Sequence, residues 1–171
     1  MHKYFVICII TSERRLLVKK ISTRFSDAIH LLAFIDIYKG KIPLSSENIA
    51  GSIETSPVMV RKLMGELRKA KLIETKHGTP DPKLAKSPDQ ISLLDVYLAV
   101  EKDKPLFEID HKTNPQCIVG GNIQETLSEY YHQAEVAAKA KLNNTKLADI
   151  IDTILVKQKE KEYKKTTDLK K

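Results

Sequence analysis

The chain has 171 residues, about one domain with an appendage, and 42% of them are hydrophobic, which excludes wholesale disorder. No apolar run reaches the roughly 18 residues of a membrane-spanning helix, and the start of the chain lacks the cleavage site of a signal peptide. Two cysteines, Cys8 and Cys117, cannot form a disulfide framework, so we expect a cytoplasmic protein.

The net charge of +7 is unevenly distributed. Residues 1–20 carry five Lys or Arg against one acid, and residues 155–171 carry seven Lys against three acids. Between these ends, residues 56–86 have eight bases against three acids, whereas residues 87–154 have six bases against eleven acids. A basic segment on an otherwise acidic body is typical of a DNA-contacting surface, although a solvated helix face would carry the same charge.

Two helices are expected before the basic segment. In residues 23–41 the apolar residues recur at helical intervals, at Phe25, Ala28, Ile29, Leu32, Ala33 and Ile37, and this helix should end near Gly40. Ser45 or Ser46 can then cap a short second helix that runs through Ile49, Ala50 and Ile53.

The third helix lies in "SPVMVRKLMGELRKAKLIETKHG", residues 56–78. Ser56 suits the N-cap and Pro57 the first helical position, where a missing amide hydrogen costs nothing. The predicted buried stripe is Val60, Leu63, Met64 and Leu67. Most of the bases fall outside this stripe, at Arg61, Lys62, Arg68, Lys69 and Lys71.

A short strand in "LIET", a turn and a second short strand follow the third helix. Helix, short helix, tight turn, helix, strand, turn and strand is the order of a winged helix-turn-helix. We therefore predict a mainly α fold with a small β wing, in which the third helix packs one side on the first two and offers the other to a DNA groove.

The second half predicts three more elements. Ser92 and Asp95 have the spacing of a capping box on a fourth helix, and a loop broken by Pro105 and Pro115 follows. A long helix runs from Cys117 to Asn143–Asn144, with an apolar face of Ile123, Leu127, Tyr130, Ala134 and Ala137. A last helix carries Leu147, Ile150, Ile151, Ile154 and Leu155. Because the small winged domain cannot cover the long helix, we expect a homodimer.

Four segments in this order resemble the Rrf-two family of bacterial winged-helix transcription regulators: "ISTRFSDAIHLLAF", "IAGSIETSPVMVRKLMGELRKAKLI", "ISLLDVYLAVEK" and "NPQCIVGGNIQETL". The resemblance covers roughly residues 21–155. It implies a DNA-binding homodimer, in which two long helices cross and which reads a palindromic operator, probing the major groove with the third helix and the flanking minor groove with the wing. The family includes iron-sulfur cluster regulators, nitric-oxide-sensing repressors and cysteine-metabolism repressors.

The resemblance places Ser56, Pro57, Val60, Arg61 and Lys62 at the major groove and the wing from His77 to Lys83 beside it. With Ser46 and Arg68 added, the residues expected at double-stranded DNA are Ser46, Ser56, Pro57, Val60, Arg61, Lys62, Arg68, His77 and Lys83. The wing departs from the family pattern, since "HGTPDP" has His where Arg is common and Pro where Gly is common. Insertion of the wing tip into the minor groove is therefore not expected to follow that pattern.

Cluster-binding members carry three cysteines between the fourth helix and the long helix, and this chain has Cys117 alone in that segment. We therefore expect the cluster-free branch, with no cofactor and no metal. Cys117 precedes a helix, where the positive end of the dipole favours thiolate, so it is the candidate redox sensor; a small buried hydrophobe is the alternative. We expect its thiol to lie where the winged domain joins the long helix.

Family members usually begin shortly before a segment like "ISTRFSDAIH", whereas some twenty residues precede it here. "SERR" is what a purine-rich ribosome-binding site would encode in frame, and Leu17 or Val18 could come from alternative start codons. We therefore expect the native protein to begin there, with residues 1–16 as mistranslated upstream sequence.

The expected parts are a leader (1–20), a winged helix-turn-helix domain (21–103), a sensor loop with dimerisation helices (104–156) and a disordered Lys-rich tail (157–171). No nucleophile motif, phosphate loop or paired-carboxylate site indicates an enzyme. The chain is therefore predicted to be a DNA-binding regulator, a repressor, that senses oxidants through Cys117. A winged helix used only for protein contacts, or a regulator that senses a small ligand without thiol chemistry, remain the alternatives.

Overall fold

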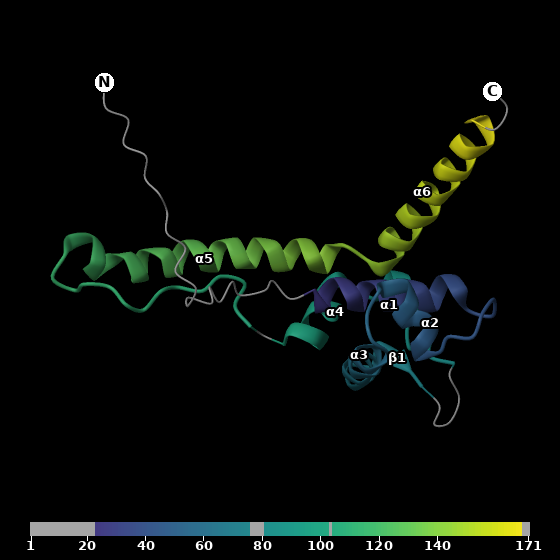
Figure 1. Ribbon diagram of the computed structural model, residues 1–171. Coiled ribbons are helices and arrows are strands. Elements are labelled where there is room, and N and C mark those ends of the chain that lie inside the picture. The colour runs from purple at the N-terminus through teal and green to yellow at the C-terminus, as the bar shows by residue number, and fades with distance from the viewer. Residues whose placement is uncertain (1–22, 76–80, 103, 169–171) are drawn as a thin grey trace, which may run out of the picture.

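The computed structural model describes residues 23–75, 81–102 and 104–168, so the predicted leader and His77 lie outside the described residues. In chain order the elements are α1 (Arg24–Tyr38), α2 (Ser46–Ile53), α3 (Pro57–Lys69), β1 (Ile73–Glu74), β2 (Lys83–Leu84), the 3-10 helix η1 (Pro88–Gln90), α4 (Leu93–Glu101), α5 (Ile118–Asn144) and α6 (Leu147–Asp168). The fold is mainly helical with one small sheet (Figure 1), as predicted. Within the described part of the chain, no helix has the length and apolar character needed to cross a membrane.

Side-chain caps fix where α2, α3 and α4 begin. The hydroxyl oxygens of Ser45 and Ser56 accept from the backbone N–H of Asn48 and Met59, which starts α2 and α3 as expected. The capping box at the start of α4 is complete, because Ser92 and Asp95 each bond the backbone of the other. The predicted starts of these three helices are confirmed.

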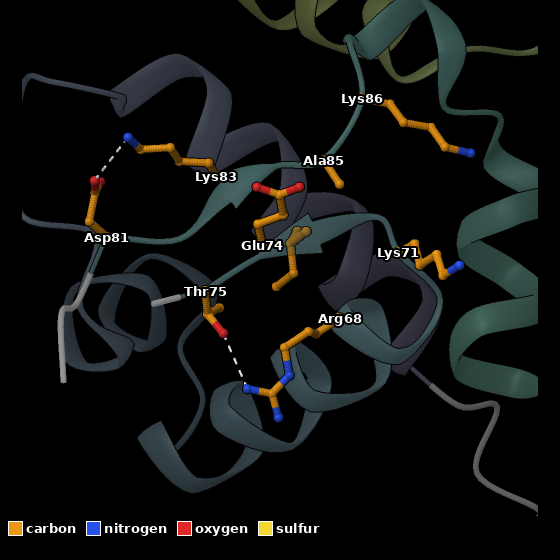
Figure 2. A pocket seen from close by; sticks show the side chains of 9 residues that line it. Arg68, Lys71, Glu74, Thr75, Asp81, Lys83, Ala85 and Lys86 are labelled. Atoms are coloured by element: carbon orange, nitrogen blue, oxygen red, sulfur yellow. Dashed lines mark hydrogen bonds and ion pairs between the residues drawn. The ribbon is translucent and has the colours of Figure 1, made fainter. Parts of the chain in front are cut away.

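The wing is a two-stranded antiparallel sheet in which Ile73 pairs with Leu84 and Glu74 with Lys83. Strand residues alternate between the two faces of a sheet. Ile73 is buried in the core, whereas Glu74 and Lys83 are exposed. The outer face of the wing is therefore polar and lies beside the C-terminal end of α3 (Figure 2).

One hydrophobic core holds the winged domain together. Its fully buried side chains come from α1, α2, α3, β1 and α4, with the predicted stripe residues Val60, Leu63 and Leu67 at its centre. Leu147 and Ile151 of α6 belong to the same core. The first turns of α6 therefore pack with the winged domain, across the boundary that the sequence placed at residues 103–104.

The long helix α5 leaves this core as an arm (Figure 1). Its C-terminal end is fastened to the winged domain, because Thr145 accepts from the N–H of Leu93 at 2.9 Å and Ile91 accepts from the N–H of Leu147 at 2.9 Å. The loop after α4 runs back along the arm to reach its far end, where α5 begins. None of the 27 residues of α5 is buried within the single chain.

Disorder was expected for residues 157–171, and this expectation is wrong as far as Asp168, because α6 continues as a helix to that residue. Lys, Glu and Gln dominate this stretch and are strong helix formers, and Gln158 donates to Glu162 one turn later at 2.7 Å. The Lys-rich composition predicted disorder, but intrinsic helix propensity extends a helix whose first turns are buried at Leu147.

Candidate nucleic-acid interface

The turn between α2 and α3 sets the direction of α3. Glu54 ends α2 in the left-handed conformation with φ 60°, and two residues later Ser56 caps α3. Val60, Leu63 and Leu67 then seat α3 on the core. Since these residues lie on one face of the helix, the opposite face is left at the surface.

The exposed face of α3 combines apolar and basic side chains. Val58 is 66% exposed and Met59 38%, and Arg61, Lys62 and Lys69 are exposed as well. Lys62 and Lys69 form no ion pair with any described residue. This surface offers hydrogen-bond donors and apolar groups together, the two kinds of contact that read base edges in a major groove.

Val60 was predicted to contact DNA, and this prediction is wrong. Its side chain is 0% exposed and packs in the core with Leu63 and Leu67. A residue of the buried stripe cannot also reach a groove on the other side of the helix. Val58 and Met59 are the exposed apolar residues of this turn, and the 100° spacing of helix positions could have identified them.

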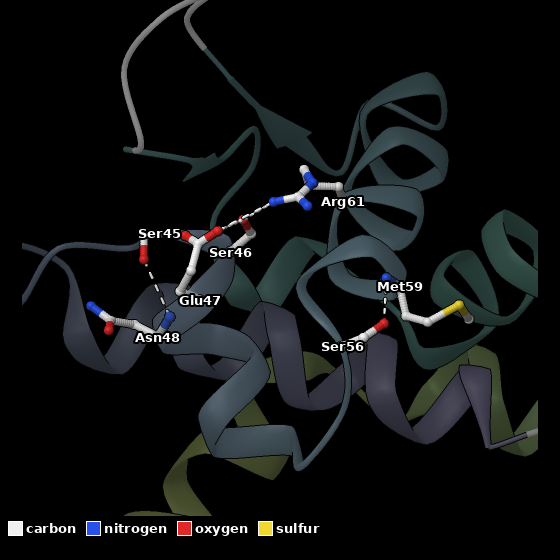
Figure 3. A network of polar contacts seen from close by, with 7 residues as sticks. All are labelled: Ser45, Ser46, Glu47, Asn48, Ser56, Met59 and Arg61. Atoms are coloured by element: carbon white, nitrogen blue, oxygen red, sulfur yellow. Dashed lines mark hydrogen bonds and ion pairs between the residues drawn. The ribbon is translucent and has the colours of Figure 1, made fainter.

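Arg61 reaches from α3 to the first turn of α2 (Figure 3). Its Nη1 donates to the Ser46 hydroxyl at 2.9 Å and to a Glu47 carboxylate oxygen at 3.2 Å. The ion pair lies at the surface, since the Arg61 side chain is 56% exposed and the Glu47 side chain is 64% exposed. The structure thus brings together Ser46 and Arg61, two of the predicted residues, and adds Glu47, which the sequence did not single out.

A hollow of about 640 Å³ lies between the C-terminal end of α3 and the wing (Figure 2). Four cations line it: Arg68, Lys71, Lys83 and Lys86. Arg68 donates to Thr75 at 3.2 Å, and Lys83 pairs with Asp81 at 3.5 Å. Lys71 and Lys86 have no ion pair among the described residues, so they add positive charge beside Arg68 and Lys83, although neither is among the residues expected at DNA.

Cys117 is exposed and caps the start of α5. The backbone N–H groups of Gly120 and then Val119 lower the pKa of the Cys117 thiol, although no hydrogen bond of ordinary geometry is made to the sulfur. The next two residues are strongly exposed, Ile118 by 87% and Val119 by 65%. The thiol is therefore open to solvent and favours thiolate.

The expected position of this thiol beside the winged domain is wrong. Figure 1 shows the start of α5 at the end of the arm that points away from the winged domain. The loop between α4 and α5 turns the chain outward before the helix brings it back, so neighbours in sequence are distant in space. At 1.5 Å per residue, the 27 residues of α5 separate the two ends by about 40 Å.

A second hollow of about 590 Å³ lies between this loop and α5. The ring of Phe107 in the loop packs against Tyr131 of α5 with centroids 5.2 Å apart, and His111 and His132 line the same hollow. The loop covers this face of α5 and leaves Tyr130 64% exposed on the face predicted for dimerisation. Of the other residues predicted there, Ala134 and Ala137 are exposed and Ile123 and Leu127 half-buried.

Comparison with known proteins identifies the family to which this chain is similar. The family model Rrf2, described as an iron-dependent transcriptional regulator, matches residues 21–153. A candidate HTH-type transcriptional regulator, YwnA of Bacillus subtilis (strain 168), is 38% identical over 132 residues, which are 77% of this chain and 97% of YwnA.

Solved structures agree with this family. A crystal structure described as a candidate DNA-binding protein is 37% identical with a TM-score of 0.60, covering 75% of this chain and 98% of that one. CymR, the global cysteine regulator of B. subtilis, is 23% identical with a TM-score of 0.59, covering 78% and 96% of the two chains, and supports the fold alone. These relatives are regulators and not enzymes. The protein with this exposed basic helix and protruding arm thus belongs to the Rrf2 family of transcriptional regulators.

Proposed function

We propose that the protein is a repressor that binds a palindromic operator as a homodimer. The observation that carries this proposal is the exposed face of α3, where Arg61 and Lys62 lie at the surface while Val60, Leu63 and Leu67 are buried in the core. In the helix-turn-helix arrangement, such a face enters the major groove. A dimer bound across one operator also blocks other proteins from that DNA, so repression needs no further surface.

Dimerisation is supported by α5. An arm of 27 residues with no buried side chain exposes Tyr130 by 64% and Val136 by 54%. Burial of such apolar area stabilises association by about 25 cal/mol per Å² before the costs of association. A second copy that crosses its own α5 would cover this face, and its two-fold axis would place two α3 helices on two half-sites of a palindrome.

Redox sensing through Cys117 is supported by its exposure and the lowered pKa of its thiol. Because the thiol is about 40 Å along α5 from its own winged domain, oxidation cannot act on that domain directly. In a dimer of crossed arms, the end that bears Cys117 would instead approach the partner. Oxidation of the thiolate by a peroxide to a sulfenic acid, or condensation of that acid with a small thiol to a mixed disulfide with loss of water, would then release DNA by disturbing that contact.

Iron plays no part in this proposal, although the family description is iron-dependent. Cys117 is the one cysteine of the described residues, and no group of three His, Cys, Asp or Glu there could hold a metal ion. The donor set that an iron-sulfur cluster requires is therefore missing from this part of the chain.

DNA binding is tested by titrating the full-length protein against a labelled duplex from its own upstream region and against a shuffled duplex, over a salt series. We expect tighter binding to the native duplex and a linear fall of log K with log salt. Lys62→Ala should weaken binding, whereas Lys112→Ala, an exposed lysine of the loop before α5, should not. Equal, salt-insensitive binding would instead favour a winged helix that contacts an acidic protein.

The redox proposal uses the same native duplex with and without hydrogen peroxide. The wild type should release DNA on oxidation, and Cys117→Ser should bind normally and ignore the oxidant. If Cys117→Ser also releases DNA, the thiol is not the sensor. The hollow lined by Phe107, Tyr131 and two histidines is then the place to seek a small-molecule effector.

A further inference from the structure

Glu47, which the sequence did not single out, contacts Arg61 on the exposed face of α3. Its carboxylate oxygen accepts from Nη1 of Arg61 at 3.2 Å and from the Ser46 hydroxyl at 3.1 Å. The Ser46 oxygen in turn accepts from the same Nη1 at 2.9 Å. The three side chains close a triangle that joins the first turn of α2 to α3 (Figure 3).

The contacts of this triangle leave some hydrogen-bond donors of Arg61 available to other partners. A guanidinium has five N–H groups in a rigid fork, and Nη1 carries two of them. Both hydrogen bonds of Arg61 use Nη1, and Nε and Nη2 have no partner among the described residues. These two nitrogens lie on the same side of the guanidinium and can bind the O6 and N7 acceptors of a guanine together.

We propose that Glu47 is a specificity-positioning residue which, with Ser46, holds Nη1 of Arg61 so that its Nε and Nη2 read one guanine in each half of the operator. This inference rests on the proposed DNA binding by α3. Glu47 itself touches no base, and acts through the direction it gives to Arg61.

The charges around the triangle favour a role for Glu47 in orienting Arg61 over a role for Arg61 in attracting DNA by charge alone. Glu47 forms an ion pair with Arg61, whereas Lys62 and Lys69 have no ion pair within the described ranges, so their charges can attract phosphates. The carboxylate is itself held in place: the pKa of Glu47 is lowered first by its own backbone N–H and then by the hydroxyls of Ser46 and Ser45. Arg61 therefore contributes mainly direction, and direction gives base discrimination.

Selection of binding sites from a random duplex library tests this directly, with full-length wild type, Arg61→Ala, Glu47→Gln and Glu47→Ala. The wild type should select a motif with one guanine per half-site that Arg61→Ala no longer prefers. Glu47→Ala should reduce preference for that guanine by about three- to tenfold and leave the other positions unchanged. Glu47→Gln keeps an acceptor for Nη1 and should fall between Glu47→Ala and the wild type.

Glu54→Gln is the matched control, because it removes the same charge from the other end of α2. Thermal melts of all variants separate loss of fold from loss of discrimination. The proposal is overturned if the Arg61-dependent guanine is unaffected by Glu47→Ala, or if both Glu47 variants bind every duplex more tightly, as removal of a mere repulsive charge would predict. A wild type that selects no motif would instead refute the proposed DNA binding itself.

Discussion

At the scale of single residues, two adjacent glycines shape the end of the arm. A Cβ atom at Gly120 would collide with the carbonyl oxygen of Asn114. A Cβ atom at Gly121 would lie 2.9 Å from the carbonyl oxygen of Pro115. The loop can therefore lie directly on the first turn of α5 only because neither residue has a side chain. The backbone N–H of Cys117 donates to the same Asn114 oxygen at 3.2 Å, which ties the thiol to this contact.

Gly120→Ala should accordingly destabilise the protein by about 1–3 kcal/mol, as overpacking against fixed backbone does. Gly65→Ala is the matched control, since a Cβ there has nothing within 4 Å and alanine favours a helix by up to about 1 kcal/mol. Urea unfolding of both variants measures the difference. Equal effects of the two substitutions would show that the loop does not lie on α5 in solution.

The Cys117 thiol should titrate below the pH of an ordinary cysteine, because the N–H groups of Gly120 and Val119 stabilise the thiolate and lower its pKa. The rate of alkylation by iodoacetamide follows the thiolate fraction, so its midpoint should lie at lower pH than that of glutathione. The same measurement in 6 M urea should return the midpoint to that of a free thiol. A native midpoint at or above the glutathione value would contradict the assignment of Cys117 as a sensor.

At the scale of elements, α5 differs from the other α-helices because none of its residues is buried within the single chain. Leu127→Glu should therefore break the dimer, since a charge in an apolar interface loses its hydration. Ser128→Glu is one residue further on, about 100° around the helix, and should leave the dimer intact. Sedimentation at micromolar concentration distinguishes these outcomes, and a wild type that is monomeric there would contradict the role given to α5.

The sequence predicted the elements of the winged domain well because their signals are local. Ser45, Ser56 and Ser92 are caps that act within three residues, and the stripe on α3 repeats at helical spacing. The buried stripe of α3 was found from the pattern alone. The DNA contact expected of Val60 came from the family resemblance and conflicts with this pattern, because Val60 is buried in the core.

The remaining features depend on contacts between distant parts of the chain. Nothing local shows that the loop after α4 runs outward, so the place of Cys117 at the far end of the arm could not be predicted. The triangle of Ser46, Glu47 and Arg61 joins residues 14 and 15 positions apart and depends on the angle between α2 and α3. The core residues Leu147 and Ile151 were recognised as apolar, but their partner was not.

At the scale of the whole molecule, the chain places its core at one end and its sensor candidate at the other. In a monomer built in this way, about 40 Å of α5 separates Cys117 from the end of the helix that joins the winged domain. Two crossed copies would shorten that path, because each thiol would approach the winged domain of the other chain. DNA binding, dimerisation and sensing are therefore linked proposals, because each requires a dimer that presents two α3 helices to the DNA.

Hydroxyl-radical footprinting of the protein on its own upstream region tests that pairing most directly. Two copies related by a two-fold axis should protect two backbone segments on one face of the duplex, with centres about 10 base pairs apart, over a palindromic sequence. Lys62→Ala should weaken both segments together, because each copy contributes the same α3. A single protected segment, or none at concentrations that saturate the arm-mediated dimer, would contradict the account.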